Sequence, residues 1–243
     1  MKIKIGTDPE IFLFNEKSKK YVSAYGLFPG TKDKPHKVDK GAVQVDGMAL
    51  EFNINPAETD TEFVKNVTTV YAQLEEMVKK VDKDLSLSID PVATFDKADW
   101  DKIHENAKEL GCDPDYNHRG EVNPNPVSKL KGEPFRTAAG HIHIGFTEGQ
   151  ELDDPIHFAD CKQISQYFYQ NAGTVRDPFF KLYYGSSKEE KERLKYYGHS
   201  GSFRPKSYGI ELRSPSNRWL VSKESIRGAF NLTKQKFETM MAV

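Results

Sequence analysis

Alternation of apolar and polar residues, the pattern of a strand with one buried face, recurs in separate segments along the chain. The predicted strands occupy residues 2–5, 10–14, 21–25, 43–55, 85–95, 138–146 and 202–213. We expect an Asp8-Pro9 turn between the first two strands, and Asp46-Gly47 is a tight-turn pair that divides 43–55 into a hairpin. Short connections of this kind favour antiparallel pairing.

Apolar residues three and four positions apart predict helices in other segments. The longest predicted helix follows the capping-box sequence Thr59-Asp60-Thr61-Glu62 and continues to Val81. Further helices are predicted at 96–110, 155–172 and 175–195, and after a cap at Ser222. Two segments rich in Gly, Pro, Asn and Asp, 26–41 and 112–135, are predicted loops that shape the choice of substrate. The pattern predicts one α+β domain over residues 1–243, with an antiparallel sheet covered by helices on one face.

Composition narrows the class of protein. Of the 243 residues, 37% are hydrophobic and 29% are charged, which is typical of a soluble globular chain. The net charge of −1 provides no overall field for nucleic acid, so nucleic acid is not an expected partner. Cys112 and Cys161 lie far apart, which disfavours a disulfide framework. No apolar run approaches the roughly 20 residues that cross a bilayer, and residues 1–6 do not resemble a signal peptide, so we expect a cytoplasmic protein.

Polar residues with metal- or phosphate-binding chemistry occur two positions apart in four of the predicted strand regions. Residues two apart on a strand point to the same face, about 7 Å apart along the strand. If the four regions join one sheet, one face is apolar and the other gathers eight polar side chains. These are Asp8, Glu10, Glu51, Asn53, His141, His143, Glu211 and Arg213.

Each pair alone has a simple structural explanation. Asp8 fits a plain turn, the pair Glu51 and Asn53 fits a half-exposed strand, and the pair Glu211 and Arg213 fits a surface ion pair. Together they are harder to dismiss, because clustered carboxylates are unstable without compensating cations. Oxygen ligands with some imidazole suit Mg²⁺ or Mn²⁺, and the Gly- and Ser-containing segment 196–206 fits a loop that contacts phosphates.

Four sequence segments together resemble a known family. They are Gly6-Thr7-Asp8-Pro9-Glu10, then Asp46-Gly47 with Glu51-Phe52-Asn53, then Ala139 to Gly145, and finally Tyr197 to Arg213. In this order they resemble the carboxylate–amine ligases of the glutamine synthetase fold, which include glutamate–cysteine ligases. The resemblance is strongest to a compact group of amidoligases found mainly in phages and bacteria, and it spans residues 6–213.

The resemblance implies an active site on the concave face of a sheet like that of the glutamine synthetase catalytic domain. Acidic side chains there hold two or three Mg²⁺ (or Mn²⁺) ions that bridge the phosphates of ATP. The implied metal ligands are Asp8, which stands where glutamine synthetases have Glu, with Glu10, Glu51, His141 and Glu211. The implied catalytic residues are Arg213, Arg204 and His141, and the implied contacts to ATP or substrate are His143, Asn53, Arg204, Lys206 and Arg213.

The function implied by the resemblance is ATP-dependent amide formation through an acyl phosphate. Its partners are a small-molecule or peptide carboxylate and an amine donor, in the host cytoplasm if the chain is phage-encoded. The sequence lacks the phosphate loop G-x-x-x-x-G-K-[ST], which disfavours a P-loop mechanism. Two alternatives stay open at this point: a metal-dependent hydrolase that uses the same face, and a non-catalytic binding protein.

Overall fold

An antiparallel sheet organised around one long strand dominates the computed structural model, which describes residues 3–108, 115–123 and 132–242. Within these residues nine strands form the sheet, and β1 (Lys4–Asn15) is its central strand. Its main path runs β10 (Phe203–Lys206), β11 (Gly209–Leu212), β9 (Gly140–Gly145), β1, β5 (Ala49–Ile54), β4 (Gly41–Asp46) and β3 (His36–Val38). β2 (Lys20–Val22) and β6 (Leu85–Ser88) pair with the second half of β1. The predicted α+β class with an antiparallel sheet is confirmed.

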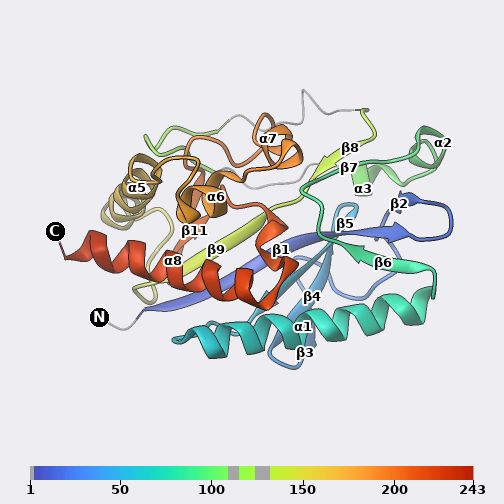
Figure 1. Ribbon diagram of the computed structural model, residues 1–243, viewed down its shortest axis with the longest axis horizontal. Coiled ribbons are helices and arrows are strands. Elements are labelled where there is room, and N and C mark those ends of the chain that lie inside the picture. Colours follow the sequence, from blue (N-terminus) through green and yellow to red (C-terminus); the bar gives the residue numbers. More distant parts are fainter. Residues whose placement is uncertain (1–2, 109–114, 124–131, 243) are drawn as a thin grey trace.

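The apolar face of this sheet packs against long helices. α1 (Asp60–Val81) and α8 (Lys223–Met241) run side by side across it (Figure 1). Side chains of α1, among them Phe63 and Val70, form one core cluster with Ile11 and Phe52 of the sheet. A second cluster joins α5 (Pro155–Gln170) and α6 (Pro178–Tyr184) to β9, β10 and β11. The strand residues between these buried ones therefore point to the opposite face.

The helix starts follow the predicted caps. The Thr59 hydroxyl accepts a hydrogen bond from the backbone N–H of Glu62 at 3.2 Å. The carboxylate of Glu62 accepts from the N–H of Glu58 at 3.1 Å, so the return bond falls one residue before the position expected in a capping box. Ser222 caps α8 as predicted, accepting from the N–H of Ser225 at 3.1 Å.

Two strand predictions were wrong in detail. The expected turn at Asp8-Pro9 does not form, and β1 continues through it. The ladder with β9 ends at Pro9 and the ladder with β5 begins at Glu10, so the missing N–H of proline falls where the pairing changes. The strand predicted over 85–95 is interrupted at Pro91, which leaves β6 and the separate β7 (Val92–Thr94).

Three further predictions were too simple. The helix predicted over 96–110 is two short pieces, α2 (Lys97–Trp100) and α3 (Glu105–Lys108), and residues 109–114 lie outside the described residues. The helix predicted over 175–195 is α6 and α7 (Lys188–Arg193), because Gly185 adopts a positive φ of 72° and ends α6. The predicted loop 26–41 contains β3, and the predicted loop 112–135 is described only at 115–123 and 132–135.

One end of the second face of the sheet is also covered. The pair β7 and β8 (Phe135–Thr137), together with α2 and α3, closes over Phe12 and Met48 in a third apolar cluster. The rest of this second face carries the polar side chains described below.

The short 3-10 helix η1 (Asn217–Val221) contributes Trp219 and Leu220 to the core cluster of α1 and α8. It also contacts β9, where the Trp219 indole N–H donates to the Gly140 carbonyl at 3.0 Å.

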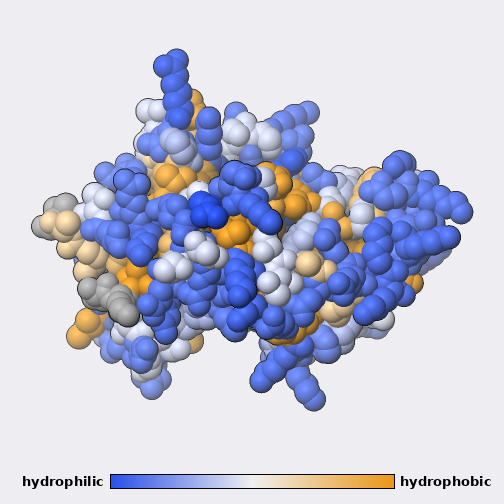
Figure 2. Space-filling view, turned by 60° about the horizontal axis from the view of Figure 1, so that its bottom comes forward, coloured by the Kyte–Doolittle hydropathy of each residue, from blue (hydrophilic) through white to orange (hydrophobic). Residues whose placement is uncertain are grey.

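The surface offers no extended apolar belt in the view of Figure 2, where hydrophobic residues appear as small separate patches among hydrophilic ones. Among the described residues, no helix combines the length and the apolar character that a membrane span requires.

Two glycine substitutions test the packing of η1 on the sheet. We expect Gly140→Ala to destabilise the protein by about 1–3 kcal/mol, because its Cβ would overlap the Ser216 carbonyl oxygen and the Trp219 indole nitrogen. Gly228→Ala in α8 is the matched control: its Cβ meets nothing within 4 Å, so we expect a gain of about 0.5–1 kcal/mol. Urea unfolding followed by circular dichroism measures both, and equal stability of the two variants would contradict the packing described.

Candidate functional site

Strand register brings the predicted polar residues onto one face of the sheet. Asp8 of β1 lies opposite His141 of β9, and His143 lies opposite Glu211 of β11. On the other side of β1, Glu10 lies opposite Glu51 of β5. Segments more than 200 residues apart in the sequence therefore meet at this face, which we call the polar face.

His141 is enclosed by polar partners on both sides of its ring. Nδ1 lies 3.2 Å from Asp8 Oδ1 and 3.4 Å from Glu211 Oε1, and Nε2 lies 3.1 Å from the Tyr197 hydroxyl. The side chain is only 4% exposed. Burial, followed by the charge of Arg213, lowers the pKa of His141 to about 4. The imidazole is therefore neutral near pH 7 and fixed in orientation.

His143 makes the closest contact to Asp8. Its Nε2 lies 2.8 Å from Asp8 Oδ1, and its Nδ1 is hydrogen-bonded to the Tyr208 hydroxyl. Burial alone would raise the pKa of Asp8, but the charges of His143 and His141 and their hydrogen bonds hold it well below its usual value. Asp8 is therefore an ionised carboxylate at neutral pH, which is the form that binds a metal ion.

Glu211 is fully buried among cationic side chains. The Arg213 guanidinium donates to its Oε1, while Lys206 Nζ lies 3.0 Å and Arg204 Nη1 3.5 Å from its Oε2. Oε2 itself accepts no hydrogen bond, so its contacts with the two cations are electrostatic. The β10 and β11 side of the polar face is thus basic around one buried acid.

Arg213, which faces the site, is held in place by several neighbouring residues. Its Nε donates to Asp115 Oδ2 at 2.9 Å, and its guanidinium lies 5.1 Å from the centre of the Tyr197 ring. Arg193 packs on the same ring at 5.4 Å and donates to the Arg213 carbonyl at 3.0 Å. The planar guanidinium is therefore preorganised by contacts on several sides.

The β4 and β5 side of the polar face is acidic. Ligand oxygens of Glu10, Asp46 and Glu51 all lie within 4.8 Å of one another. Burial and the charge of Asp46 raise the pKa of Glu10 to about 8. Burial raises the pKa of Asp46, and burial with the charges of Asp8 and Asp46 raises that of Glu51 well above the usual value. These shifts have one cause, the crowding of carboxylates away from water.

Neutral groups partly satisfy these acids. The side-chain amide of Gln44 donates to Glu51 Oε1 at 3.1 Å, and the N–H of Ala139 donates to Glu10 Oε2 at 2.7 Å. Among the described residues, no lysine or arginine lies within ion-pair distance of Glu10 or Glu51. A divalent cation would supply the missing charge.

Two groups of side chains on this face have the spacing of metal ligands. The acidic group is Glu10, Asp46 and Glu51, and the second group is Asp8, His143 and Glu211, also with ligand atoms within 4.8 Å. The second group contains His143, whereas both ring nitrogens of His141, the histidine named by the resemblance, face Asp8, Glu211 and Tyr197. Carboxylate oxygens with one imidazole match the ligand preference of Mg²⁺ or Mn²⁺.

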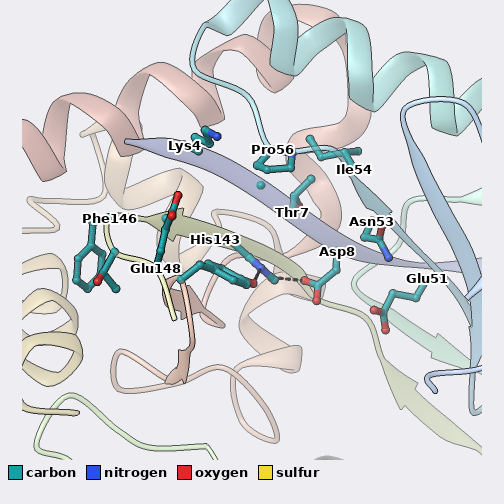
Figure 3. Close-up of a pocket in the computed structure, with 14 residues that line it drawn as sticks. Lys4, Thr7, Asp8, Glu51, Asn53, Ile54, Pro56, His143, Phe146 and Glu148 are labelled. Carbon is teal, nitrogen blue, oxygen red and sulfur yellow. Dashed lines mark hydrogen bonds and ion pairs between the residues drawn. The ribbon is translucent and has the colours of Figure 1, made fainter. Parts of the chain in front are cut away.

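A cavity of about 620 Å³ opens beside the two groups. Figure 3 shows Asp8, His143 and Glu51 at its base, with Asn53 next to Glu51 and with Phe146 and Glu148 at the other end. Gly6, Gly145, Ile54, Pro56 and Tyr208 complete much of its wall. Its volume lies within the range typical of small-molecule sites.

The sequence analysis missed several members of this site. Asp46 was interpreted as a turn residue, but it pairs with Ala49 and ends β4, with Gly47 and Met48 forming the two-residue loop. Its period-two relation to Gln44 was the available signal. Tyr197 and Tyr208, each followed by a glycine in the sequence, contact the two histidines. Asp115 comes from a loop whose position no local pattern indicates.

All ten predicted site residues lie on or beside this face, but they do not all make the same kind of contact. Asn53 lines the cavity and has no side-chain hydrogen bond within the described part of the chain. Arg204 and Lys206 contact Glu211. Neither the comparison with protein-family models nor that with curated protein sequences gives a match to this chain.

The raised pKa of Glu10 predicts a pH effect on stability. Between about pH 6.5 and pH 8 the carboxyl is ionised in the unfolded chain but still protonated in the folded protein, so stability falls as the pH rises. The slope due to Glu10 is roughly 1 kcal/mol per pH unit. His141 opposes it weakly near pH 6.5, because its imidazole is still partly protonated in the unfolded chain and neutral in the folded protein.

We expect Glu10→Gln to reduce this loss of stability, since an amide does not titrate and still accepts from Ala139. Urea unfolding at pH 6.5 and pH 8 in metal-free buffer gives the two free energies for each protein. An identical change in the parent and in Glu10→Gln would show that Glu10 ionises normally.

Proposed function

We propose that the protein is an ATP-dependent carboxylate–amine ligase. One observation carries the proposal: two groups of metal-ligand side chains lie on one sheet face, directly beside a basic group on the neighbouring strands. Phosphoryl transfer from ATP requires this combination, because metal ions and fixed cationic donors must surround the moving phosphate oxygens. The resemblance to ligases of the glutamine synthetase fold supports the same function and assigns the same face to it.

Mg²⁺ or Mn²⁺ fits the residues present. Crowded buried carboxylates with raised pKa values are the feature expected where a cation completes a site. Glu10, Asp46 and Glu51 would hold one ion, and Asp8, His143 and Glu211 another. When bound, such ions neutralise the phosphate oxygens of ATP.

The basic side of the face supplies the phosphate contacts in this proposal. Arg213 presents a planar guanidinium that Asp115 and Tyr197 hold in place, which suits a transferred phosphoryl group. Arg204 and Lys206 lie on the neighbouring strand β10 and would exchange part of their contact with Glu211 for phosphate oxygens. His141 stays neutral and positions Asp8 and Glu211 between these charges.

The proposed reaction has two steps, phosphoryl transfer and then amide formation. A carboxylate oxygen of the first substrate attacks the γ-phosphorus of ATP, the bond from that phosphorus to the bridging oxygen breaks, and ADP leaves. An amine that binds as its ammonium ion loses one proton to solvent before the second step. The uncharged nitrogen then attacks the acyl carbon, the bond to the phosphate oxygen breaks, and phosphate leaves with the electron pair. The nitrogen loses a further proton to solvent, and an amide remains.

Nucleotide binding tests the site. We expect Mg²⁺ and ATP at a hundredfold excess over Kd to stabilise the protein by about 2.7 kcal/mol, a rise in Tm of several degrees in a thermal melt. Glu51→Gln and Glu211→Gln should lose this rise, because each removes one carboxylate from a ligand group. Glu76→Gln, which removes an exposed charge on α1 across the sheet, should keep it.

The melts without nucleotide check that each variant folds. A full shift in both folded site variants would rule out the assigned ligand groups, and no shift in the parent would rule out nucleotide binding.

Hydroxylamine distinguishes a ligase from a hydrolase. We expect ADP release to depend on an added carboxylate, and hydroxylamine to convert the acyl phosphate into a hydroxamate that ferric chloride detects. A panel of amino-acid and peptide carboxylates, tested with Mg²⁺ and ATP, covers the proposed substrate class. Phosphate release that is independent of any carboxylate and yields no hydroxamate would instead support a metal-dependent hydrolase on the same face.

A further inference from the structure

Charge is divided across the polar face in the order of the strands. Arg204, Lys206 and Arg213 lie on β10 and at the end of β11, the histidines lie on β9, and the acidic group lies on β1, β5 and β4. An anionic ligand is favoured on the first side and a cationic ligand on the last. The cavity is bounded by the acidic side and not by the basic group, since neither Arg204, Lys206 nor Arg213 lines it.

The lining of the cavity excludes a second anion. Asp8, Glu51 and Glu148 contribute carboxylates, and Lys4 on the rim is the one lysine or arginine among the described lining residues. Asp8 is paired with His143, but among the residues that the structure describes Glu51 accepts only from the neutral Gln44. A substrate carboxylate placed here would lie among the carboxyl groups of Asp8, Glu51 and Glu148, whereas an ammonium group would find acceptors in Glu51 and the Asn53 amide oxygen.

The size of the cavity distinguishes between amines. About 620 Å³ is far more than ammonia requires, and Ile54, Pro56, Phe146 and Tyr208 provide apolar and aromatic walls. Ammonia has no carbon atoms that could contact these walls. An organic amine would bury its carbon chain against them, which contributes about 0.8 kcal/mol of binding free energy for each buried methylene.

Two glycines keep this volume open. A Cβ at Gly6 would lie 3.7 Å from the Cβ of His143 and 3.8 Å from that of Pro56, and one at Gly145 would come no closer than 3.5 Å to any atom. All three distances are ordinary van der Waals contacts, and neither glycine has a positive φ. The fold therefore tolerates a side chain at these positions, and glycine leaves space that the fold itself does not require.

We infer that this cavity binds the amine co-substrate, and that this co-substrate is an organic primary amine held as its ammonium ion near Glu51 and Asn53, with its carbon chain along the Phe146 wall. The role as co-substrate rests on the proposed ligase function, whereas the binding of the amine does not. The substrate carboxylate and the phosphates of ATP then occupy the basic side of the face.

Ligand-observed saturation-transfer NMR with the full chain at pH 7 tests the inference. The probes are pentylammonium, pentanoate and ammonium ion, each titrated with Mg²⁺ present. We expect pentylammonium to receive saturation from the protein and pentanoate not to, and ammonium added in excess not to displace pentylammonium.

Gly6→Leu is the deciding variant because it fills the cavity without removing a charge. We expect it to weaken pentylammonium binding by about tenfold or more, corresponding to about 1.4 kcal/mol of lost burial. Gly6→Ala should have a smaller effect on pentylammonium binding. Glu151→Gln should have none, because Glu151 is exposed in the loop between β9 and α5 and does not line the cavity. The rise in Tm with Mg²⁺ and ATP reports separately on the nucleotide site in each variant.

Three results would overturn the inference: pentanoate binding as well as pentylammonium, unchanged pentylammonium binding in Gly6→Leu, or complete displacement of pentylammonium by Mg²⁺ with a non-hydrolysable ATP analogue. The last would place the nucleotide in the cavity. Loss of nucleotide stabilisation in the parent with pentylammonium binding retained would instead contradict the proposed ligase while leaving the amine site in place.

Discussion

Repulsion among carboxylates that share one partly dry face is the constraint on which the site depends. Glu211 is balanced by three cationic side chains, and Asp8 is hydrogen-bonded to two histidines. Within the described parts of the chain, Glu10 and Glu51 have hydrogen bonds only from a backbone N–H and an amide side chain, and burial raises the pKa of both carboxyl groups. The protein thus carries a strip of crowded carboxyl groups whose ionised form a bound cation would stabilise, next to a strip of positive charge suited to phosphate.

This division of charge gives each part of the proposed reaction a place. Anionic phosphates meet Arg213 and its neighbours, metal ions meet the two ligand groups, and an ammonium ion meets the acidic edge where the cavity opens. Tyr197 and Asp115 fix Arg213, while Tyr208 fixes His143, so that little reorganisation would be needed as charge moves. The helices on the apolar face stabilise the sheet and leave the polar face accessible.

The sequence was sufficient to predict which residues share the polar face, because strand alternation has a period of two and the apolar partners alternate with it. It was insufficient for the register, which decides that Glu10 faces Glu51 and Glu211 faces His143. Asp46 was missed because an Asp-Gly pair also fits a turn. Pro9 suggested a break, yet it lies where the pairing of β1 changes from β9 to β5.

The wrong helix prediction over residues 96–110 has a tertiary cause. Residues 97–108 have helical propensity, but the Arg136 guanidinium lies 4.4 Å from the centre of the Trp100 ring and donates to the Lys108 carbonyl. The segment folds around this buried arginine as two short helices. Contacts from residues far along the chain also supply Asp115 and Tyr197 to the site, and no local pattern predicts them.

Anomalous diffraction from a crystal grown with Mn²⁺ and a non-hydrolysable ATP analogue tests the central claim most directly. The account predicts manganese peaks coordinated by the Glu10, Asp46 and Glu51 group and by the Asp8, His143 and Glu211 group, with the γ-phosphate toward Arg213. A nucleotide bound elsewhere, or a polar face that stays free of manganese while the nucleotide is bound, would contradict it.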